Sequence, residues 1–172
     1  MILDKIYLKR ILTKNLSNKE LLMVVNLKRT HWKYSLKSQL KWIKQNSLAN
    51  DNHFLLLKDK ELIGYVHLGL RTLENAKIKK KYILFRNLII KNNFRKKNFS
   101  GIIMRKVNNY ILSKKKSSFL VCKKSLLNFY KKNNWNKVDK KKFLLMDHNY
   151  NNMCLMSYNL NTKKETRFYY YK

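Results

Sequence analysis

The chain has 172 residues, a length typical of one domain that buries its core without disulfides or metal ions. It carries 40 Lys and Arg against 9 Asp and Glu, a formal net charge of +31, with no proline and three glycines. Because the lysines are spread over almost every segment, we interpret the charge as a solvated basic surface of a compositionally biased sequence. Nucleic acid is therefore the less favoured partner.

Two further features bear on the compartment and on redox or metal chemistry. The first ten residues, MILDKIYLKR, lack the apolar core of a signal peptide, and no stretch approaches about 18 consecutive apolar residues. We therefore expect a cytoplasmic protein with no membrane span. Cys122 and Cys154 have no second Cys or His at ligand spacing, so we expect two core-facing strand residues, no disulfide and no metal site.

The first half of the chain predicts two helices and four strands. Ser17 and Glu20 have the spacing of a capping box and precede an apolar run, which predicts the first helix. Ser35 or Ser38 is the candidate cap of a second helix that ends at Asn46. Strands are expected over 5–12, 53–58, 62–70 and 82–90, with a hairpin turn at 59–61.

The second half predicts two strand-then-helix repeats followed by closing strands. Ser125 is the expected cap of the last helix, and Asn133 and Asn134 its end. We expect one domain spanning 1–172, in which the tail, 161–172, is polar and then aromatic, and both a packed and a peripheral tail stay open. The remaining elements are helices over 101–112 and 126–132 and strands over 119–122, 143–146 and 153–160.

A basic loop, KNNFRKKNFSG (91–101), joins the fourth expected strand to the following helix. The backbone N–H groups at a helix N-terminus, with Arg95, Lys96 and Lys97 around them, suit a phosphate-bearing ligand. Tyr130, on the last expected helix, supplies a titratable phenol. The second half of the chain therefore predicts a phosphate site and a proton donor.

These segments resemble the GNAT superfamily of acyl-CoA-dependent N-acetyltransferases. The acyl-CoA motif of that family reads L-x-V-x-P-x-x-[RQ]-x-x-G-x-[GA], and Leu88, Ile90 and Arg95 occupy its first, third and eighth positions. A second family motif, F-Y-x-x-x-G-[FW], is similar to FYKKNNW (129–135), which differs from it at Asn134. The resemblance covers about residues 50 to 160.

The loop departs from the family motif at three positions. Asn92 replaces the proline, and Asn98 and Ser100 replace the two glycines, although Gly101 follows at once. Asparagine tolerates left-handed backbone geometry better than other non-glycine residues, so the loop conformation remains feasible.

The resemblance implies an α/β fold with a mixed, mostly antiparallel central sheet, flanked by helices and splayed between its fourth and fifth strands to admit acetyl-CoA. The main chain of Leu88, Ile89 and Ile90 would bind the pantetheine arm and polarise the thioester carbonyl. The pyrophosphate would lie on the start of the following helix, held by Arg95, Lys96, Lys97, Asn98, Phe99, Ser100 and Gly101.

The resemblance also assigns roles to side chains. Tyr130 matches the tyrosine that protonates the departing thiolate. For the general base, His67 is the first candidate because imidazole titrates near neutrality, His31 is the second and Asp147 the third; ordered water is the alternative. A separate set is expected to border the acceptor groove: His31, Trp32 and Tyr34.

The expected reaction is transfer of an acetyl group from acetyl-CoA to a primary amine on a small molecule such as an amino sugar. One alternative is acetylation of a protein N-terminus or lysine. The other is a non-catalytic family member that binds CoA or nucleic acid. Among oligomeric states, a homodimer stays open.

Overall fold

The computed structural model describes residues 5–75, 77–146, 149, 152–160 and 165–170. Contacts divide the chain into two units. The first unit comprises Met1–Gly69 and Asn87–Met104, and the second comprises Leu70–Arg86 and Arg105–Lys172. Each unit is described by itself below.

The first unit is built on an antiparallel arrangement of β1 (Ile6–Leu12), β2 (Asn52–Lys58) and β3 (Glu61–Asn75). β1 pairs with β2 along its whole length, and β2 pairs with β3 through a register that shifts between Leu56 and Leu57. Between β2 and β3, Asp59 and Lys60 have φ angles of 46° and 74°. Two consecutive left-handed residues are typical of a two-residue hairpin turn, so the hairpin predicted at this place is confirmed.

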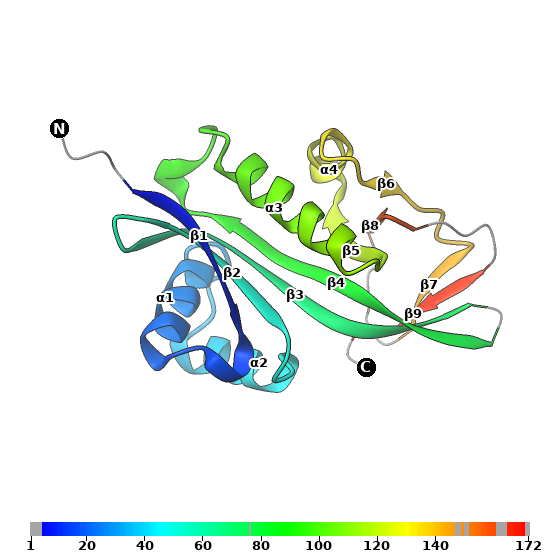
Figure 1. Ribbon diagram of the computed structural model, residues 1–172, viewed down its shortest axis with the longest axis horizontal. Helices are drawn as coiled ribbons and strands as arrows, with labels where there is room; N and C mark the ends of the chain where they lie inside the picture. Colours follow the sequence, from blue (N-terminus) through cyan, green and yellow to red (C-terminus); the bar gives the residue numbers. More distant parts are fainter. Residues whose placement is uncertain (1–4, 76, 147–148, 150–151, 161–164, 171–172) are drawn as a thin grey trace. The chain divides into compact units, whose positions relative to one another are not determined.

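Two helices, α1 (Asn18–Arg29) and α2 (Leu36–Asn46), lie on the same side of these strands (Figure 1). The predicted capping box is present: Ser17 Oγ accepts from the Glu20 N–H, and the Glu20 carboxylate accepts from the Ser17 N–H. Of the two candidate caps for α2, the structure selects Ser35, whose Oγ accepts from the backbone N–H of Ser38.

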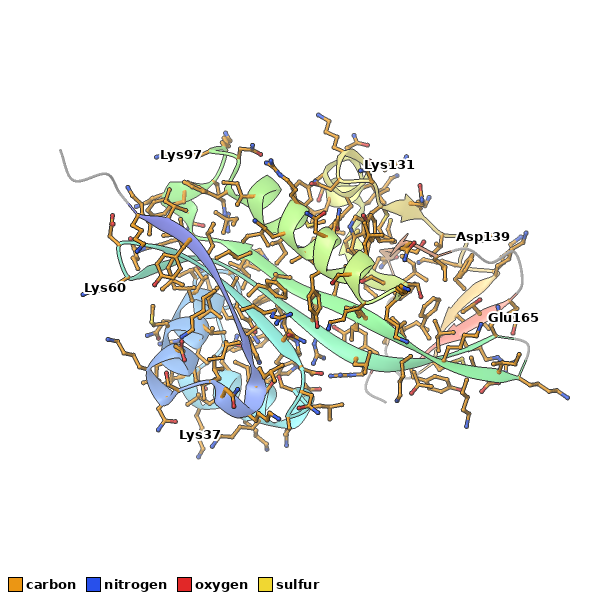
Figure 2. The ribbon with its side chains drawn as sticks, viewed as in Figure 1. Lys37, Lys60, Lys97, Lys131, Asp139 and Glu165 are labelled. Atoms are coloured by element: carbon orange, nitrogen blue, oxygen red, sulfur yellow. The ribbon has the colours of Figure 1, made fainter. Side chains whose placement is uncertain are left out.

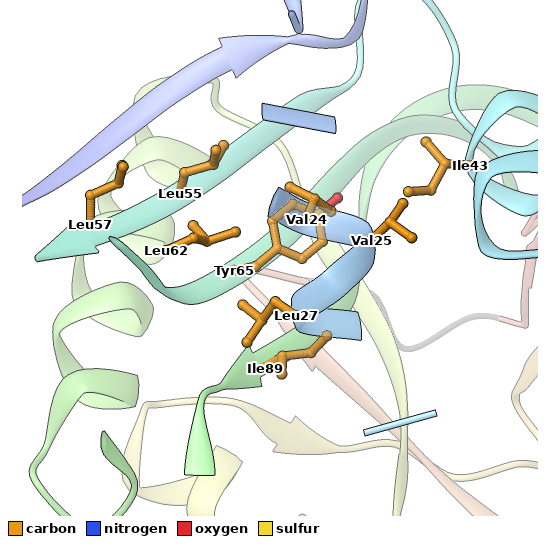
Figure 3. Close-up of a cluster of buried hydrophobic side chains, with 9 residues drawn as sticks. All are labelled: Val24, Val25, Leu27, Ile43, Leu55, Leu57, Leu62, Tyr65 and Ile89. Atoms are coloured by element: carbon orange, nitrogen blue, oxygen red, sulfur yellow. The ribbon is translucent and has the colours of Figure 1, made fainter. Parts of the chain in front are cut away.

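The core of the first unit lies between these helices and the strands (Figure 3). Apolar side chains recur along α1 at helical spacing, so this helix turns one face inward. Leu55 and Leu57 of β2 belong to the same cluster, and the other face of β2 is buried as well. The cluster comprises Val24, Val25, Leu27, Ile43, Leu55, Leu57, Leu62, Tyr65 and Ile89.

The second unit contains the remaining strands and the short helix α4 (Leu127–Lys132). β5 (Ser118–Lys123) pairs antiparallel with β8 (Met153–Tyr158) along its whole length, and β6 (Asn136–Lys137) lies on the other side of β8. Its core cluster comprises Leu73, Tyr82, Leu84, Phe119, Val138, Leu145, Leu155 and Phe168.

The described part of the tail packs against the second unit. β9 (Thr166–Phe168) pairs with the end of β3 and with β7 (Phe143–Leu145). Phe168 is fully buried, and its ring stacks on Phe119 with 4.1 Å between centroids. The tail therefore completes the core of the second unit, because an aromatic ring of this size gains more from burial than from exposure.

The prediction that Ser125 caps the last helix is wrong. A 3-10 turn, η3 (Lys124–Leu126), precedes α4, and Leu126 occupies the capping position without a side-chain hydrogen bond. The predicted end of the helix is confirmed, since Asn134 takes the left-handed conformation with φ 66°.

The described strands form a mixed sheet in the order β1-β2-β3-β4-β5-β8-β6, where β4 spans Ile78–Ile90. β4 and β5 are parallel, whereas β1–β2, β2–β3, β5–β8 and β6–β8 are antiparallel. Among the described residues, the β4–β5 ladder covers only Ile83↔Ser118 and Leu84↔Phe119. The mostly antiparallel fold with a short parallel ladder between the fourth and fifth strands is therefore confirmed.

In the part of the chain that the structure describes, no helix is both long and apolar enough to cross a membrane.

Candidate functional site

The end of β4 has an irregular backbone. Asn87 has a φ of 60° inside the strand, a conformation that asparagine tolerates and that interrupts regular pleating. After it, Leu88 is half-buried while Ile89 and Ile90 are buried, and the Lys91 N–H donates to the carbonyl of Ile63 on β3 at 2.8 Å. The three residues expected to bind the pantetheine arm therefore follow a break in the strand.

The loop after β4 turns sharply before it enters α3 (Phe99–Ser113). A 3-10 turn, η2 (Asn92–Phe94), comes first, and Lys96 and Asn98 then have φ angles of 61° and 60°. Arg95, which precedes them, is extended with φ −69° and ψ 159°, so the two left-handed residues reverse the chain direction before the helix. Asn98 thus adopts the geometry for which the family motif uses glycine.

Contacts of the loop with β4 and β3 hold it in place. The Arg95 Nε donates to the carbonyl of Ile90 at 3.1 Å, and Lys91 forms an ion pair with Glu61. Lys97 is exposed and extends away from the ribbon, with its Nζ 5.8 Å from the centre of the Phe94 ring (Figure 2). Arg95 therefore anchors the loop with one of its five N–H donors while its positive charge stays at the loop.

Two glycines let this region pack closely. A Cβ on Gly64 of β3 would lie 2.8 Å from Ile103 Cδ1 and 2.9 Å from Ile90 Cδ1, so α3 approaches the sheet only because residue 64 has no side chain. At the start of α3, the side chain of Asn98 occupies the space that a Cβ on Gly101 would need. Gly101 therefore serves the turn at Asn98, although neither glycine has a positive φ itself.

Tyr130, the expected proton donor, lies in the second unit on α4. Its side chain is 6% exposed, and its ring packs edge-on against Phe85 of β4, with 6.0 Å between centroids, and beside Phe129 and Trp135. Burial raises the pKa of the phenol far above its ordinary value, and the neighbouring Cys122 raises the pKa further. A phenol is protonated at neutral pH whether or not it is buried, and the raised pKa makes Tyr130 a weaker acid than an exposed tyrosine.

The end of the FYKKNNW segment is fixed by buried polar contacts. The indole Nε1–H of Trp135, which is almost fully buried, donates to Asn108 Oδ1 of α3 at 3.0 Å. The amide of Asn108 in turn donates to the carbonyl of Asn133 at 2.9 Å. These bonds satisfy the indole and close the turn after α4.

His67, the first candidate for the base, lies on β3 as expected and is buried. Its Nε2 is 3.3 Å from Asp51 Oδ2, and both side chains are 1% exposed. Asp51 precedes β2, and its carboxylate also accepts from the Leu48 N–H. The structure therefore places a carboxylate beside this imidazole at a position closed to solvent.

The structure adds a second histidine that sequence reasoning missed. His53 of β2 is the cross-strand partner of His67, with 4.8 Å between ring centroids. Its Nδ1 lies 2.8 Å from the hydroxyl of Tyr65 and its Nε2 lies 2.9 Å from the hydroxyl of Thr13. The described part of the chain holds no group of three or more His, Cys, Asp or Glu side chains arranged to bind a metal ion.

The expected acceptor residues follow α1. Tyr34 is 64% exposed and His31 is exposed, and the rings of His31 and Trp32 meet edge to face at 4.6 Å. Trp32 is partly buried against the core of the first unit, and the buried Lys28 places its Nζ 3.9 Å from the ring centre of Trp42. Trp32 thus has a packing role as well as an exposed edge.

The remaining expected residues are placed as follows. Asp147, the third candidate for the base, lies outside the described residues. Cys122 is buried on β5, opposite Cys154 on β8, and both thiols are free. Burial raises the pKa of Cys122 from 9.0 to about 12, with a smaller contribution from Cys154.

No protein-family model matches the chain, and no curated protein sequence is significantly similar to it. Several solved structures share its fold. Escherichia coli ElaA is similar with a TM-score of 0.67 at 14% identity, over 89% of this chain and 99% of that chain. These observations define the class: the chain has the fold of the GNAT N-acetyltransferases.

Several of the similar structures contain coenzyme A. One is the GNAT-family N-acetyltransferase YhbS from Escherichia coli, with a TM-score of 0.69 at 7% identity over 96% of this chain and 90% of that chain. Another is an aminoglycoside 6'-N-acetyltransferase, with a TM-score of 0.64 at 11% identity over 91% of this chain and 99% of that chain.

Proposed function

We propose that this protein is an acetyltransferase that moves an acetyl group from acetyl-CoA to a primary amine of a small molecule such as an amino sugar. The observation that carries the proposal is the conformation of residues 87–101. This segment keeps an interrupted strand, two left-handed loop residues and a helix N-terminus although its sequence has lost two motif glycines. Structures with the same fold hold coenzyme A.

In this proposal the first unit supplies the cofactor site. The main chain of Leu88, Ile89 and Ile90 binds the pantetheine arm and polarises the thioester carbonyl. The N–H groups of residues 96–101 hold the pyrophosphate at the positive end of α3. The charged side chains of Arg95, Lys96 and Lys97 add to the attraction, and Asn98, Phe99, Ser100 and Gly101 shape the loop.

The proposed reaction is a single acyl transfer. The neutral amine attacks the thioester carbonyl carbon, the new C–N bond forms and the C–S bond breaks. Tyr130 gives its phenolic proton to the departing thiolate, and the amine loses a proton to base. Because His67 is buried beside Asp51, we assign this proton to the pair through an intervening water or side chain rather than by direct contact.

The acceptor is assigned to the surface after α1. His31, Trp32 and Tyr34 offer aromatic edges of the kind that bind a sugar face or an apolar amine. The same surface suits a protein N-terminus or lysine, so substrate competition between an amino sugar and a peptide distinguishes the two acceptor classes.

The first test is acetyl-CoA binding by isothermal titration calorimetry in salt that screens the basic surface. Desulfo-CoA is the competitor, and an unrelated polyanion is the control. Binding of acetyl-CoA without binding of the polyanion supports the proposal and justifies a screen of amines. If acetyl-CoA and the polyanion bind equally, or if neither binds, the acetyltransferase proposal is overturned and a non-catalytic protein is favoured.

A charge reversal tests the loop directly. Lys97→Glu is expected to raise the KM for acetyl-CoA by about tenfold, because it replaces an attraction to phosphate by a repulsion. Lys41→Glu, at an exposed position of α2, changes the net charge equally and should leave this KM unchanged. Equal effects of the two substitutions would count against the placement of the pyrophosphate.

A further inference from the structure

The second unit contains a hollow that the acyl-transfer proposal does not use. Its volume is about 440 Å³, within the range of ligand pockets. Lys80 and Lys81, near the start of β4, line it together with Lys115 and Lys116, which follow α3. None of its lining residues belongs to the loop over 91–101.

The walls that carry these lysines are tied to their neighbours. The amide of Asn159 donates to the carbonyl of Lys116 at 2.9 Å. The amide of Asn75 donates to Thr166 Oγ1 at 2.7 Å, and the Thr166 N–H donates to the carbonyl of Lys142 at 2.8 Å. Hydrogen bonds thus tie Lys116 to Asn159 and Asn75 to Thr166, so these parts of the lining are held in place.

The charged residues that line the hollow are all basic. Its described residues are four lysines, Ser117, Thr166, two asparagines and two leucines, without Asp or Glu. The ammonium group of Lys81 donates to Thr72 Oγ1 at 3.0 Å. The nearby Glu165 carboxylate is exposed and is paired with Arg167. Four like charges in one hollow repel each other, so an anion that neutralises them binds favourably.

The same lining excludes one kind of ligand contact. No aromatic side chain or arginine is present among its described residues, so a nucleobase finds no stacking surface. Lysine recognises phosphate as a compact point charge and does not require the planar geometry of a guanidinium site. The lining therefore suits phosphate groups themselves rather than the base of a nucleotide.

We propose that this hollow is a second anion site, which binds a small ligand through two or more phosphate groups. The site is independent of the proposed acetyl transfer. A basic surface alone would bind polyanions anywhere, whereas this site requires the lysines of the hollow.

The test is binding of inorganic tripolyphosphate to the full chain, measured by calorimetry in about 0.15 M salt, where the Debye length is about 8 Å. Lys80→Gln/Lys115→Gln removes one charge from each lysine pair. Lys123→Gln/Lys124→Gln removes two exposed charges from the same unit and is the matched control. Thermal unfolding checks that both variants fold.

The wild-type protein and the control are expected to bind equally, and the variant of the hollow about tenfold or more weakly. The weakening caused by Lys80→Gln/Lys115→Gln should persist when Lys97→Glu is present, since that change lowers only the binding of the probe at the acetyl-CoA loop. Equal weakening in both double variants, or no wild-type binding, overturns the proposal. A short oligouridylate that displaces the probe and loses affinity in the same variant would assign the hollow to nucleic acid, which also overturns it.

Discussion

Replacement of Gly64 by alanine tests the packing that holds the acyl-CoA loop. The new methyl group would lie 2.8 Å from Ile103 Cδ1, 2.9 Å from Ile90 Cδ1 and 3.3 Å from Leu56 Cβ. Both isoleucine atoms are side-chain ends and can move, whereas Leu56 Cβ is fixed to the strand. Because Ile90 precedes the loop and Ile103 follows it, the displacement is expected to reach both of its ends.

Two opposing effects set the magnitude. Overpacking a core by one methyl group costs about 1 to 3 kcal/mol, and the lower end applies where flexible side-chain ends can yield. Gly→Ala also lowers the entropy of the unfolded chain, which recovers about 0.4 to 1 kcal/mol. Gly64→Ala should therefore reduce the free energy of unfolding by about 0.5 kcal/mol, as measured by urea denaturation with an unchanged m-value.

A second substitution tests whether the cost arises from the contact with Ile103. Ile103→Val removes the Cδ1 atom in question and alone costs about 0.5 to 1.5 kcal/mol. Combined with Gly64→Ala it should cost less than the sum, by about 0.5 kcal/mol or more, because the methyl group fills the space. Ile43→Val, in the cluster formed with α1 and α2, should be additive. Additivity at Ile103, or a more stable Gly64→Ala protein, would refute the argument.

Three further outcomes are expected. Tyr130→Phe should lower kcat by about a hundredfold or more with little change in KM for acetyl-CoA, as expected for loss of a general acid; a full kcat in steady-state assays would remove this role. Asp51→Asn leaves the buried His67 without its carboxylate and should destabilise the fold by about 3 to 5 kcal/mol in urea denaturation, and the double change with His67→Gln should cost less than the sum. Because burial raises the pKa of Cys122, the folded state holds that proton more tightly. The contribution of this thiol to stability should be constant below pH 9 and fall as pH rises from 9 to 12, and Cys122→Ala should remove that part of the alkaline fall. An equally steep fall in that variant would place the titration elsewhere.

Local signals predicted the elements that depend on local chemistry. The Ser17 and Glu20 pair marked the start of α1, and the turn at Asp59 and Lys60 joined β2 to β3, because caps and tight turns are made by neighbouring residues. The FYKKNNW segment likewise ended its helix at Asn134.

Long-range pairing was not predictable in the same way. A three-residue strand has almost no periodic signal, so β9 is recognisable only through its pairing with β3 and β7. The contact between His53 and His67 depends on the register shift between Leu56 and Leu57. Without that shift, the hairpin turn would bring His53 opposite Val66 and turn the two rings to different faces.

The distribution of left-handed residues bears on how stable this chain could be made. Ten described non-glycine residues have positive φ, and none of the glycines does. Four of the ten are lysines, which lack the short polar side chain that makes this conformation tolerable for asparagine: Lys60, Lys77, Lys96 and Lys115. In this glycine-poor sequence, lysines occupy several left-handed turn positions. The left-handed conformation of each such lysine costs about 1 kcal/mol of stability. Lys60 and Lys77 lie outside both the acyl-CoA loop and the hollow. Their replacement by glycine should raise the melting temperature without changing either site, so these two positions are the first to substitute in a more stable variant.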